Sequence, residues 1–305
     1  MELRSPASVE EAKRWLRAGE TTIKTSANRA FQGDLSLDRA FELGHRRPDL
    51  VWAVFDGDRM HGVTAGRELP DGFRLLDIFA IGPAPSASLL IERATEWAGE
   101  GDAAEASFGA PIEGIQDPAT DELVQMLKRA GWRLFVTRQH YEVAPESLPR
   151  EGHPLRGRLE RASADDEERL AELLQRVLEG SLDVRDREML AKHGDASGEV
   201  FARELIAADP IEFAHFAVVD GRDAGVVVWR KLPDGRGYVA FAGVAADSRG
   251  MGLGRGMLSV ATLSLLEEGA TVLIADTDDA NTPMRKAFES VGWRPSEARI
   301  DLTLR

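Results

Sequence analysis

Runs of apolar residues, separated by turn residues, follow one another in a similar order in the two halves of the chain. The runs at 50–55 and 212–219 are rich in β-branched and aromatic residues, which favour strands. Each run is followed by an Asp-Gly dipeptide, a strong hairpin signal, at 56–57 and 220–221. A second apolar run comes next, at 61–68 and 224–231. The pattern predicts an antiparallel strand pair in each half.

Segments with helical spacing of apolar residues alternate with further strand-like runs around each hairpin. Ser8 and Ser163 are plausible N-caps for a first helix in each half. In the first half, the pattern predicts helices at 9–18, 86–99 and 119–130, and further strands at 73–81, 105–110 and 133–143. In the second half, it predicts helices at 165–179, 253–268 and 282–291, and further strands at 237–244, 271–277 and 299–304. This order predicts an α/β fold in which a mixed, mostly antiparallel sheet is flanked by helices.

The chain also contains an internal repeat. Phe55-Asp56-Gly57 matches Val219-Asp220-Gly221, Leu69-Pro70-Asp71-Gly72 matches Leu232-Pro233-Asp234-Gly235, and Ala130-Gly131-Trp132-Arg133 matches Val291-Gly292-Trp293-Arg294. Several matches at nearly one offset indicate two copies of one fold. Pro145, Pro149 and Pro154 interrupt regular structure between the copies. We therefore expect two domains, at residues 1–148 and 157–305.

Composition narrows the possible functions. The chain has 305 residues and no cysteine, so disulfides, thiolate metal sites and cysteine nucleophiles are excluded; we expect no metal ion. Its net charge is −14, and neither half is basic, so nucleic acid is not an expected partner. No apolar run approaches the roughly 18 residues that cross a bilayer, and no secretory segment follows Met1. We expect a cytoplasmic protein without a membrane partner.

The most informative segment lies between the predicted strand at 237–244 and the helix that follows. Gly250, Gly252 and Gly254 alternate with other residues there. Such glycines let the backbone turn sharply and approach a ligand, and the first turn of a helix offers unpaired N–H groups to an anion. Arg249 adds a permanent cation whose donors suit phosphate. The segment predicts a site for a phosphate or pyrophosphate group.

Two common phosphate-binding motifs do not fit this segment. The dinucleotide fingerprint requires a third glycine at its sixth position, where counting from Gly250 gives Arg255 and counting from Gly252 gives Met257. The P-loop requires Gly-Lys-Ser/Thr, which does not follow. The ligand is therefore expected to belong to another class.

The pattern R-x-x-G-x-G, formed by Arg249, Gly252 and Gly254, resembles the acetyl-CoA pyrophosphate loop of the GNAT (N-acetyltransferase) superfamily. The segment from Asn281 to Trp293 resembles the N-x-x-(A)-x-x-x-(Y)-x-x-x-G-(F/W) helix of the same superfamily. The predicted order of elements is similar in both halves. The resemblance implies two GNAT-like domains in tandem, with acetyl-CoA as cosubstrate of the second.

The resemblance also implies which residues bind acetyl-CoA. The exposed backbone at Gly243, Val244 and Ala246 would hold the pantetheine arm and the thioester carbonyl. The remaining residues implied in acetyl-CoA binding are Arg249, Gly250, Met251, Gly252, Leu253, Gly254, Arg255, Asn281 and Phe288.

The first half departs from the family pattern after its third strand. It has Ile81-Gly82-Pro83-Ala84-Pro85 there, without an arginine or alternating glycines. The two prolines also lack the N–H donors that a pyrophosphate would use. We interpret the first half as a degenerate copy that supports the second.

The catalytic groups are less clear from the sequence. Many members of the superfamily have at position 288 a tyrosine that protonates the leaving thiolate, whereas this chain has Phe288, so the thiolate would leave unassisted, through water or near Ser290. Asn281 and Tyr238 are candidate catalytic residues. The general base stays open among Asp276, Asp278, Asp279, Glu212, His215 and Tyr238. The segment 180–198, with Asp183, Asp186 and Glu188, corresponds to the variable region that shapes acceptor specificity.

Together these features favour an N-acyltransferase that moves an acetyl group from acetyl-CoA to a primary amine of a small molecule or peptide. The amine would attack directly in a ternary complex, since no cysteine can form an acyl-enzyme. A non-catalytic acyl-CoA-binding or regulatory protein is the alternative, motivated by Phe288. An aminoacyl-tRNA-dependent transferase fits less well with the intact loop and the acidic charge. We expect a monomer or homodimer.

Overall fold

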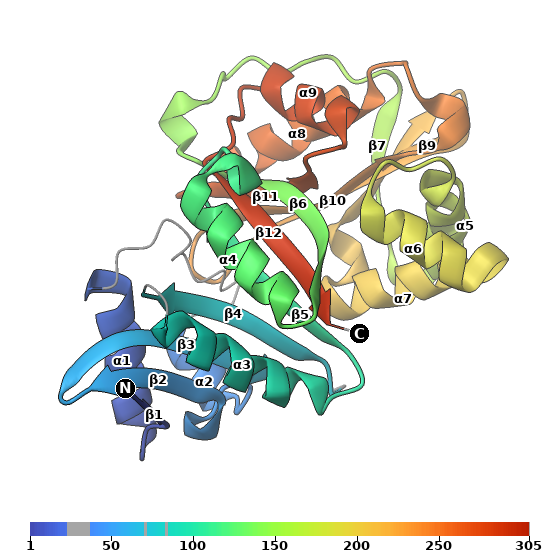
Figure 1. Cartoon of the computed structure of the whole chain (residues 1–305). Coiled ribbons are helices and arrows are strands. Elements are labelled where there is room, and N and C mark those ends of the chain that lie inside the picture. The colour runs from blue at the N-terminus through green and yellow to red at the C-terminus, as the bar shows by residue number, and fades with distance from the viewer. Residues whose placement is uncertain (23–36, 70–71, 83–84, 305) are drawn as a thin grey trace. The chain divides into compact units, whose positions relative to one another are not determined.

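The computed structural model describes residues 1–22, 37–69, 72–82 and 85–304, and the chain divides into two compact units (Figure 1). The first unit comprises residues 1–137 and 297–305, and the second comprises residues 138–296. Each unit has a mixed sheet with helices on both faces, so the predicted fold class is confirmed. Pro70, Asp71, Pro83 and Ala84, which belong to two of the motifs above, lie outside the described residues.

The sheet of the first unit runs in the order β1, β2, β3, β4, β5 and β12, in which β4 and β5 are parallel and the other neighbours are antiparallel. Its elements are β1 (Glu2–Arg4), α1 (Val9–Thr22), α2 (Leu37–Glu42), β2 (Val51–Asp56), β3 (Arg59–Glu68), β4 (Arg74–Ile81), α3 (Ser86–Gly99), β5 (Ala104–Ala110), α4 (Pro118–Arg129) and β12 (Glu297–Leu304). Successive side chains of a strand point to opposite faces, so each strand contributes to two apolar layers.

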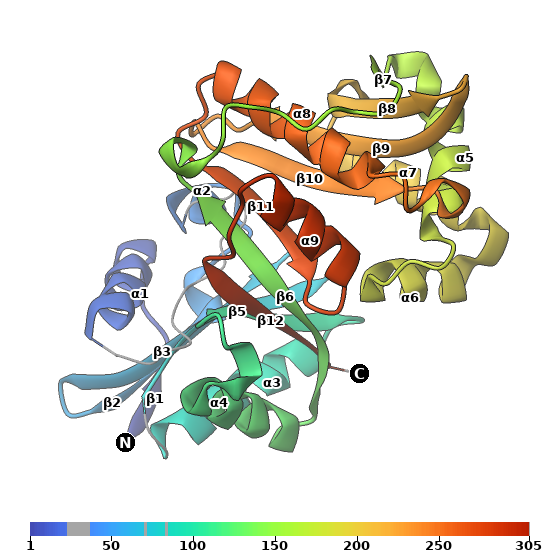
Figure 2. The same cartoon turned by 90° about the horizontal axis from the view of Figure 1, so that it is seen from above.

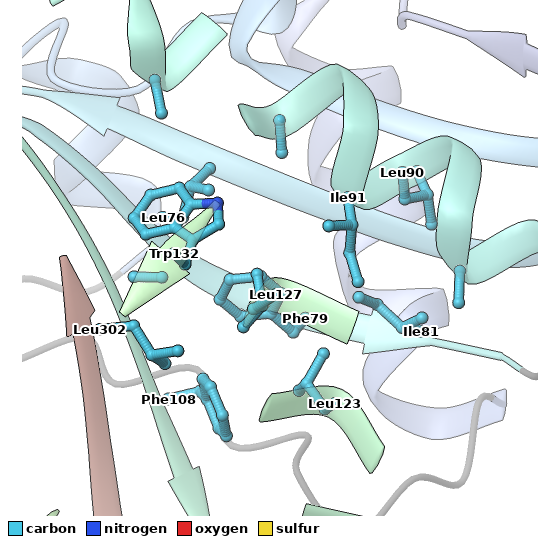
Figure 3. Close-up of a cluster of buried hydrophobic side chains, with 14 of the residues drawn as sticks. Leu76, Phe79, Ile81, Leu90, Ile91, Phe108, Leu123, Leu127, Trp132 and Leu302 are labelled. Atoms are coloured by element: carbon cyan, nitrogen blue, oxygen red, sulfur yellow. The ribbon is translucent and has the colours of Figure 1, made fainter. Parts of the chain in front are cut away.

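Figure 3 shows the larger of these layers, beneath α3 and α4. Phe79 of β4 and Phe108 of β5 meet edge to face there, with ring centroids 5.4 Å apart. The indole N–H of Trp132, buried in the same layer, donates to Thr95 Oγ1 at 2.8 Å. The other layer, beneath α1 and α2, includes Leu16 and Phe41.

The sheet of the second unit repeats this arrangement in the order β7, β8, β9, β10, β11 and β6, with β10 and β11 parallel. Its elements are β6 (Trp132–Val143, of which 138–143 lie in this unit), β7 (Arg158–Arg161), α5 (Glu167–Leu178), α6 (Val184–His193), α7 (Ser197–Ala208), β8 (Ala214–Val219), β9 (Arg222–Lys231), β10 (Gly237–Val244), α8 (Leu253–Glu267), β11 (Leu273–Asp278) and α9 (Thr282–Ser290). No helix in the described part of the chain is long and apolar enough to cross a membrane.

Helices α8 and α9 cover one face of the second sheet, and α5 and α7 cover the other (Figure 2). Neighbouring residues of β9 divide between the faces: Val227 packs beneath α8 and α9, whereas Val226 packs beneath α5 and α7. The indole N–H of Trp293 donates to Thr262 Oγ1 at 3.0 Å, which repeats the contact between Trp132 and Thr95 in the first unit.

Each unit takes its last strand from the other half of the sequence. Strand β12, at the end of the chain, pairs with β5 from Ala298–Ala110 to Leu304–Ala104. Residues 138–143 of β6 pair with β11 in the second unit. The expected domains, 1–148 and 157–305, therefore do not coincide with the compact units. A repeat in sequence marks equivalent strands, but it does not specify which sheet each final strand joins.

Candidate functional site

The site begins where β10 and β11 separate. These parallel strands pair at Gly237–Leu273 and Tyr238–Ile274, and within these two described strands the pairing does not extend toward Val244. A register shift between Val239 and Phe241 marks a β-bulge opposite β9. Gly243 lies just beyond it, where an added Cβ would come within 2.5 Å of Val177 Cγ1. Only glycine fits this close approach, and the separation leaves β10 backbone facing a cavity.

The loop after β10 has the backbone that its glycines suggested. Gly250 and Gly252 adopt φ values of +80° and +76°, a left-handed conformation that favours glycine. Helix α8 begins at Leu253, and the amide of Gly256 donates to Gly252 O at 3.1 Å in the first turn. The amides that precede Gly256 have no carbonyl within the helix to bind, because no helical turn lies before them. Free amides at the start of a helix favour an anion, so this terminus is a candidate anion site.

Arg249 has a different environment from the one expected. Its guanidinium donates to four backbone carbonyl oxygens, those of Val244 (3.2 Å), Gly180 (2.9 Å), Val177 (2.8 Å) and Glu179 (2.8 Å). Three of these oxygens belong to the end of α5 and the residues after it, where a helix leaves carbonyl groups without intrahelical partners. Arg249 therefore joins the glycine loop to the end of α5, and four of its five N–H donors are already used.

A cavity of about 760 Å³ lies between this loop, the exposed edge of β10 and the first turns of α9. Its lining includes Gly243, Val244, Arg249, Gly250, Gly252, Leu253, Gly254, Arg255 and Asn281, all expected from the sequence. Lys286, which the sequence analysis did not single out, adds a further cation. The cavity is of a size that holds a large cofactor or cosubstrate, and three of its side chains are basic.

Three expected acetyl-CoA residues lie outside the lining of this cavity. Ala246 is exposed at the start of a short 3₁₀ turn. Met251 packs against a small apolar cluster that contains Leu253. Phe288 is buried and stacks on Tyr141, with ring centroids 4.5 Å apart.

A second cavity, of about 300 Å³, is enclosed by α6, α7 and the ends of β10 and β11. Four carboxylates and two arginines line it: Asp183, Asp186, Glu204, Asp276, Arg138 and Arg185. Phe201, Met189 and Leu205 provide apolar walls. The excess of carboxylates favours a cationic ligand that also has an apolar part.

The two cavities adjoin, because five residues line both of them. They are Asp186, Phe241, Ala242, Asn281 and Met284. Asn281 also caps α9, where its Oδ1 accepts the Met284 amide at 3.3 Å. Its capping and cavity-lining roles therefore coexist.

Burial changes the ionisation of two carboxyl groups beside the smaller cavity. Burial raises the pKa of Asp186 to about 6, although its Oδ2 accepts a hydrogen bond from Ser181 Oγ at 2.6 Å. Burial, followed by repulsion from Asp183, also raises the pKa of Asp278. Asp278 accepts the amide of Val184 at 2.7 Å, which anchors the start of α6.

The other candidate bases are placed differently. Asp276 lines the smaller cavity and lies 3.0 Å from His140 Nδ1. Asp279 pairs with Arg285 at 3.2 Å. His215 stacks on Trp229, with centroids 3.7 Å apart. Among the described residues that line the two cavities, neither His215 nor Glu212 is present.

Tyr238 and Ser290 complete the expected chemistry. Tyr238 is the second residue of β10, six residues before Val244, a separation of about 20 Å along a strand. It is not among the described residues that line either cavity. Ser290 lines the larger cavity and donates its hydroxyl to Ala287 O at 2.7 Å.

Arg138 is a site residue that the second half of the sequence could not reveal. It lies on β6, which precedes the repeat boundary, and it lines the smaller cavity. Its Nε lies 3.4 Å from Asp278 Oδ1. No motif marks Arg138, because its place in the site depends on which sheet β6 joins.

The first unit has different residues at the corresponding position of its sheet. The first parallel pair is Arg74–Ala104 in the first unit and Gly237–Leu273 in the second. Counted along the strands from these pairs, Phe79 corresponds to Ala242 and Phe108 corresponds to Thr277. Ala242 and Thr277 line the smaller cavity. The phenyl rings close the space between β4 and β5 that smaller side chains leave open in the second unit. This difference agrees with the interpretation of the first half as a degenerate copy.

Comparisons with known proteins agree with this architecture. Residues 178–293 match the acetyltransferase (GNAT) family. A GCN5-related N-acetyltransferase from Sphaerobacter thermophilus has a TM-score of 0.62 at 12% identity, covering 99% of this chain and 94% of the other. A tandem GNAT protein from the clavulanic acid biosynthesis pathway has a TM-score of 0.60 at 16% identity, covering 99% and 98%.

These structural similarities show a shared fold, and a search of curated proteins found no match. Acyl transfer from acyl-CoA is the general activity of the family that residues 178–293 match. The chain thus contains an acetyltransferase (GNAT) family domain at residues 178–293, within a tandem arrangement of two GNAT-fold units.

Proposed function

We propose that this protein transfers the acetyl group of acetyl-CoA to a primary amine of a small molecule or peptide, with both substrates bound together. The observation that carries the proposal is the junction of two cavities of opposite charge in one unit. Arg249, Arg255 and Lys286 line the larger cavity, and carboxylates predominate in the smaller one. Acetyl-CoA carries phosphates and an amine acceptor carries a positive charge, so each substrate matches one cavity.

The larger cavity supports binding of acetyl-CoA along its length. The amides at the start of α8 would bind the pyrophosphate, with Arg255 and Lys286 neutralising phosphate charge. The open backbone at Gly243 and Val244 would bind the pantetheine arm. The thioester would then lie near Phe241 and Ala242, which line both cavities.

The smaller cavity supports binding of the acceptor. Its carboxylates would attract an ammonium group, and Phe201 and Met189 would contact apolar parts of the molecule. The amine nitrogen and the thioester carbon would meet where the cavities join. Holding the two reactants together in this way is a large part of the rate enhancement in acyl transfer.

The leaving thiolate receives no proton from position 288, because Phe288 has no ionisable group and lies buried against Tyr141. We propose that the thiolate takes its proton from water in the larger cavity. The same observation favours an alternative function, in which the protein binds acyl-CoA without transferring the acyl group.

The replacement Gly254→Val tests the proposed acetyl-CoA site. The nearest atom to an added Cβ at Gly254, outside its chain neighbours and its own helix, is Val244 Cγ2 at 3.9 Å, so the folded chain accommodates the side chain. The added bulk would obstruct the pyrophosphate. We expect acetyl-CoA affinity to fall by at least about 100-fold by calorimetry, roughly 2.7 kcal/mol, with the melting temperature preserved.

Glu267→Val, at the other end of α8, is the matched control and should bind acetyl-CoA normally. Unchanged affinity in Gly254→Val would refute the site. Tight acetyl-CoA binding without thiol release from any amine in a broad panel would favour the non-catalytic alternative.

A further inference from the structure

We infer that Asp186 is the general base of this protein, the group that accepts the proton of the attacking amine. The inference rests on the proposed acyl transfer and adds the residue that the sequence left unidentified. It is drawn from the position of Asp186 at the junction of the two cavities and from the contacts that hold its side chain.

Asp186 is the only carboxylate among the described residues that lines both cavities. The amine and the thioester must meet at that junction, and a base acts only within hydrogen-bond reach of the proton it removes. Asp183, Glu204 and Asp276 line the smaller cavity alone. They can attract a cation, but they do not line the larger cavity, in which the thioester is proposed to lie.

One contact holds the carboxylate of Asp186, and a second holds its backbone. Ser181 Oγ donates to Asp186 Oδ2 at 2.6 Å, and Asp183 Oδ1 accepts the Asp186 amide at 3.3 Å as the N-cap of α6. Asp278 binds the neighbouring amide of Val184. These contacts fix the first turn of α6, so Asp186 needs little rearrangement before it accepts a proton.

Three of the competing carboxylates of the smaller cavity and its rim have other partners. Asp276 lies 3.0 Å from His140 Nδ1 and Asp279 lies 3.2 Å from Arg285. Asp183 uses one oxygen to cap α6, where it accepts the Arg185 amide at 2.9 Å. These three carboxylates are thus engaged by a basic side chain or by helix amides, whereas the carboxylate of Asp186 accepts a hydrogen bond from the Ser181 hydroxyl.

The charges around Asp186 suit this role. Burial is the largest influence and raises its pKa to about 6; the negative charge of Asp183 acts in the same direction. The pKa of Asp186 is lowered, in turn, by the hydrogen bond from Ser181 and by the positive charges of Arg138 on β6 and Arg249 before α8. A base with a pKa near the working pH combines a large ionised fraction with useful basicity.

The reaction balances with no additional reagent. Asp186 takes one proton from the ammonium group, and the freed nitrogen lone pair forms the C–N bond at the thioester carbon. The C–S bond breaks and its electron pair stays on sulfur. The second nitrogen proton reaches the thiolate through water, and Asp186 releases its own proton to solvent, so the products are the amide, free thiol and one proton.

Asp186→Asn tests the assignment with acetyl-CoA and a panel of amines, including spermidine, tyramine and glucosamine, using thiol release as the readout. We expect kcat/KM for the amine that the unmodified protein uses best to fall by roughly 100- to 10,000-fold. Acetyl-CoA affinity, measured by calorimetry, should be retained. Asp195→Asn, an exposed site in the short turn before α7, is the matched control and should behave like the unmodified protein.

Ser181→Ala gives a second readout that a merely structural role would not move. Because the base must be ionised, kcat/KM should rise with pH through the pKa of Asp186. Removing the hydroxyl that stabilises the carboxylate should move this limb to higher pH, with acetyl-CoA affinity preserved.

Normal turnover by Asp186→Asn, or a Ser181→Ala profile identical to that of the unmodified protein, would overturn the assignment of Asp186 and leave acyl transfer in place. Absence of thiol release by the unmodified protein with every amine would contradict the proposed function, and the assignment with it.

Discussion

At the scale of single residues, Arg249 is a motif side chain whose hydrogen bonds are made to backbone carbonyl groups. Its four bonds reach carbonyl oxygens at the end of α5 and at Val244. Arg249 thereby connects the glycine loop with the segment that carries Ser181 and Asp186. Arg255 differs: it is exposed and lines the larger cavity, and we propose that its charge faces a phosphate of acetyl-CoA.

We predict that Arg249→Gln lowers the free energy of unfolding by about 1–3 kcal/mol, because several charge-assisted hydrogen bonds are lost at once. Acetyl-CoA affinity should fall as well, since the loop loses its attachment to α5. Urea unfolding and calorimetry measure the two effects. Arg255→Gln is the matched control, expected to weaken acetyl-CoA binding without a change in stability. Equal stability losses in both variants would contradict the attachment role.

At the scale of elements, α6 is held at its start by two carboxylates, of which one is buried. Asp278, fully buried on β11, accepts the amide of Val184, the first residue of the helix. Asp183 accepts the next two amides as the N-cap. Burial raises the pKa of Asp278, and the negative charge of Asp183 raises it further, because two ionised acids placed together repel each other.

This arrangement predicts a pH dependence of stability. A carboxyl group whose pKa is raised on folding holds its proton more tightly in the folded than in the unfolded state. Its stabilising contribution is complete below its unfolded pKa near 4 and is lost as the pH rises through its folded pKa. Asparagine does not titrate, so the stability of Asp278→Asn relative to the unmodified protein should increase between about pH 4 and pH 7. Urea unfolding across this range measures it, and a flat difference would contradict it.

The separated strands β10 and β11 are a second feature at this scale, and they differ from β4 and β5 in the size of two side chains. Ala242 and Thr277 leave space where Phe79 and Phe108 fill the corresponding place in the first unit. One fold therefore forms either a cavity or a packed core, depending on side-chain volume at two positions.

At the scale of the whole molecule, each unit takes its final strand from the other half of the sequence. We expect this arrangement to determine which fragments of the chain fold on their own. Tyr141 of β6 is fully buried in the second unit, against Phe288 and Trp293. A fragment that starts at residue 157 lacks β6, so it exposes the edge of β11 and loses the ring of Tyr141. Loss of one large aromatic side chain from a core costs about 3–5 kcal/mol.

We therefore predict that a fragment of residues 138–296 unfolds cooperatively and binds acetyl-CoA, whereas a fragment of residues 157–305 does neither. Circular dichroism with thermal unfolding, followed by calorimetry, tests both. Cooperative folding of the 157–305 fragment with normal acetyl-CoA affinity would show that β6 is dispensable.

The sequence by itself determined the local structure and the chemistry of the loop. Asp-Gly dipeptides set the hairpins, alternation set the strands, and Gly250 and Gly252 set a left-handed turn before α8, because each of these depends on neighbouring residues alone. The spacing of Arg249, Gly252 and Gly254 predicts an anion site in the same loop, and this prediction also uses neighbouring residues alone.

Only the tertiary structure decided which distant residues meet. Arg138 enters the site because β6 joins the second sheet, and Asp186 reaches the junction because α6 is anchored on Asp278 of β11. The donors of Arg249 bind carbonyls about 70 residues earlier in the chain. Such contacts depend on strand pairing and on helix ends far apart in sequence, which a local pattern does not encode.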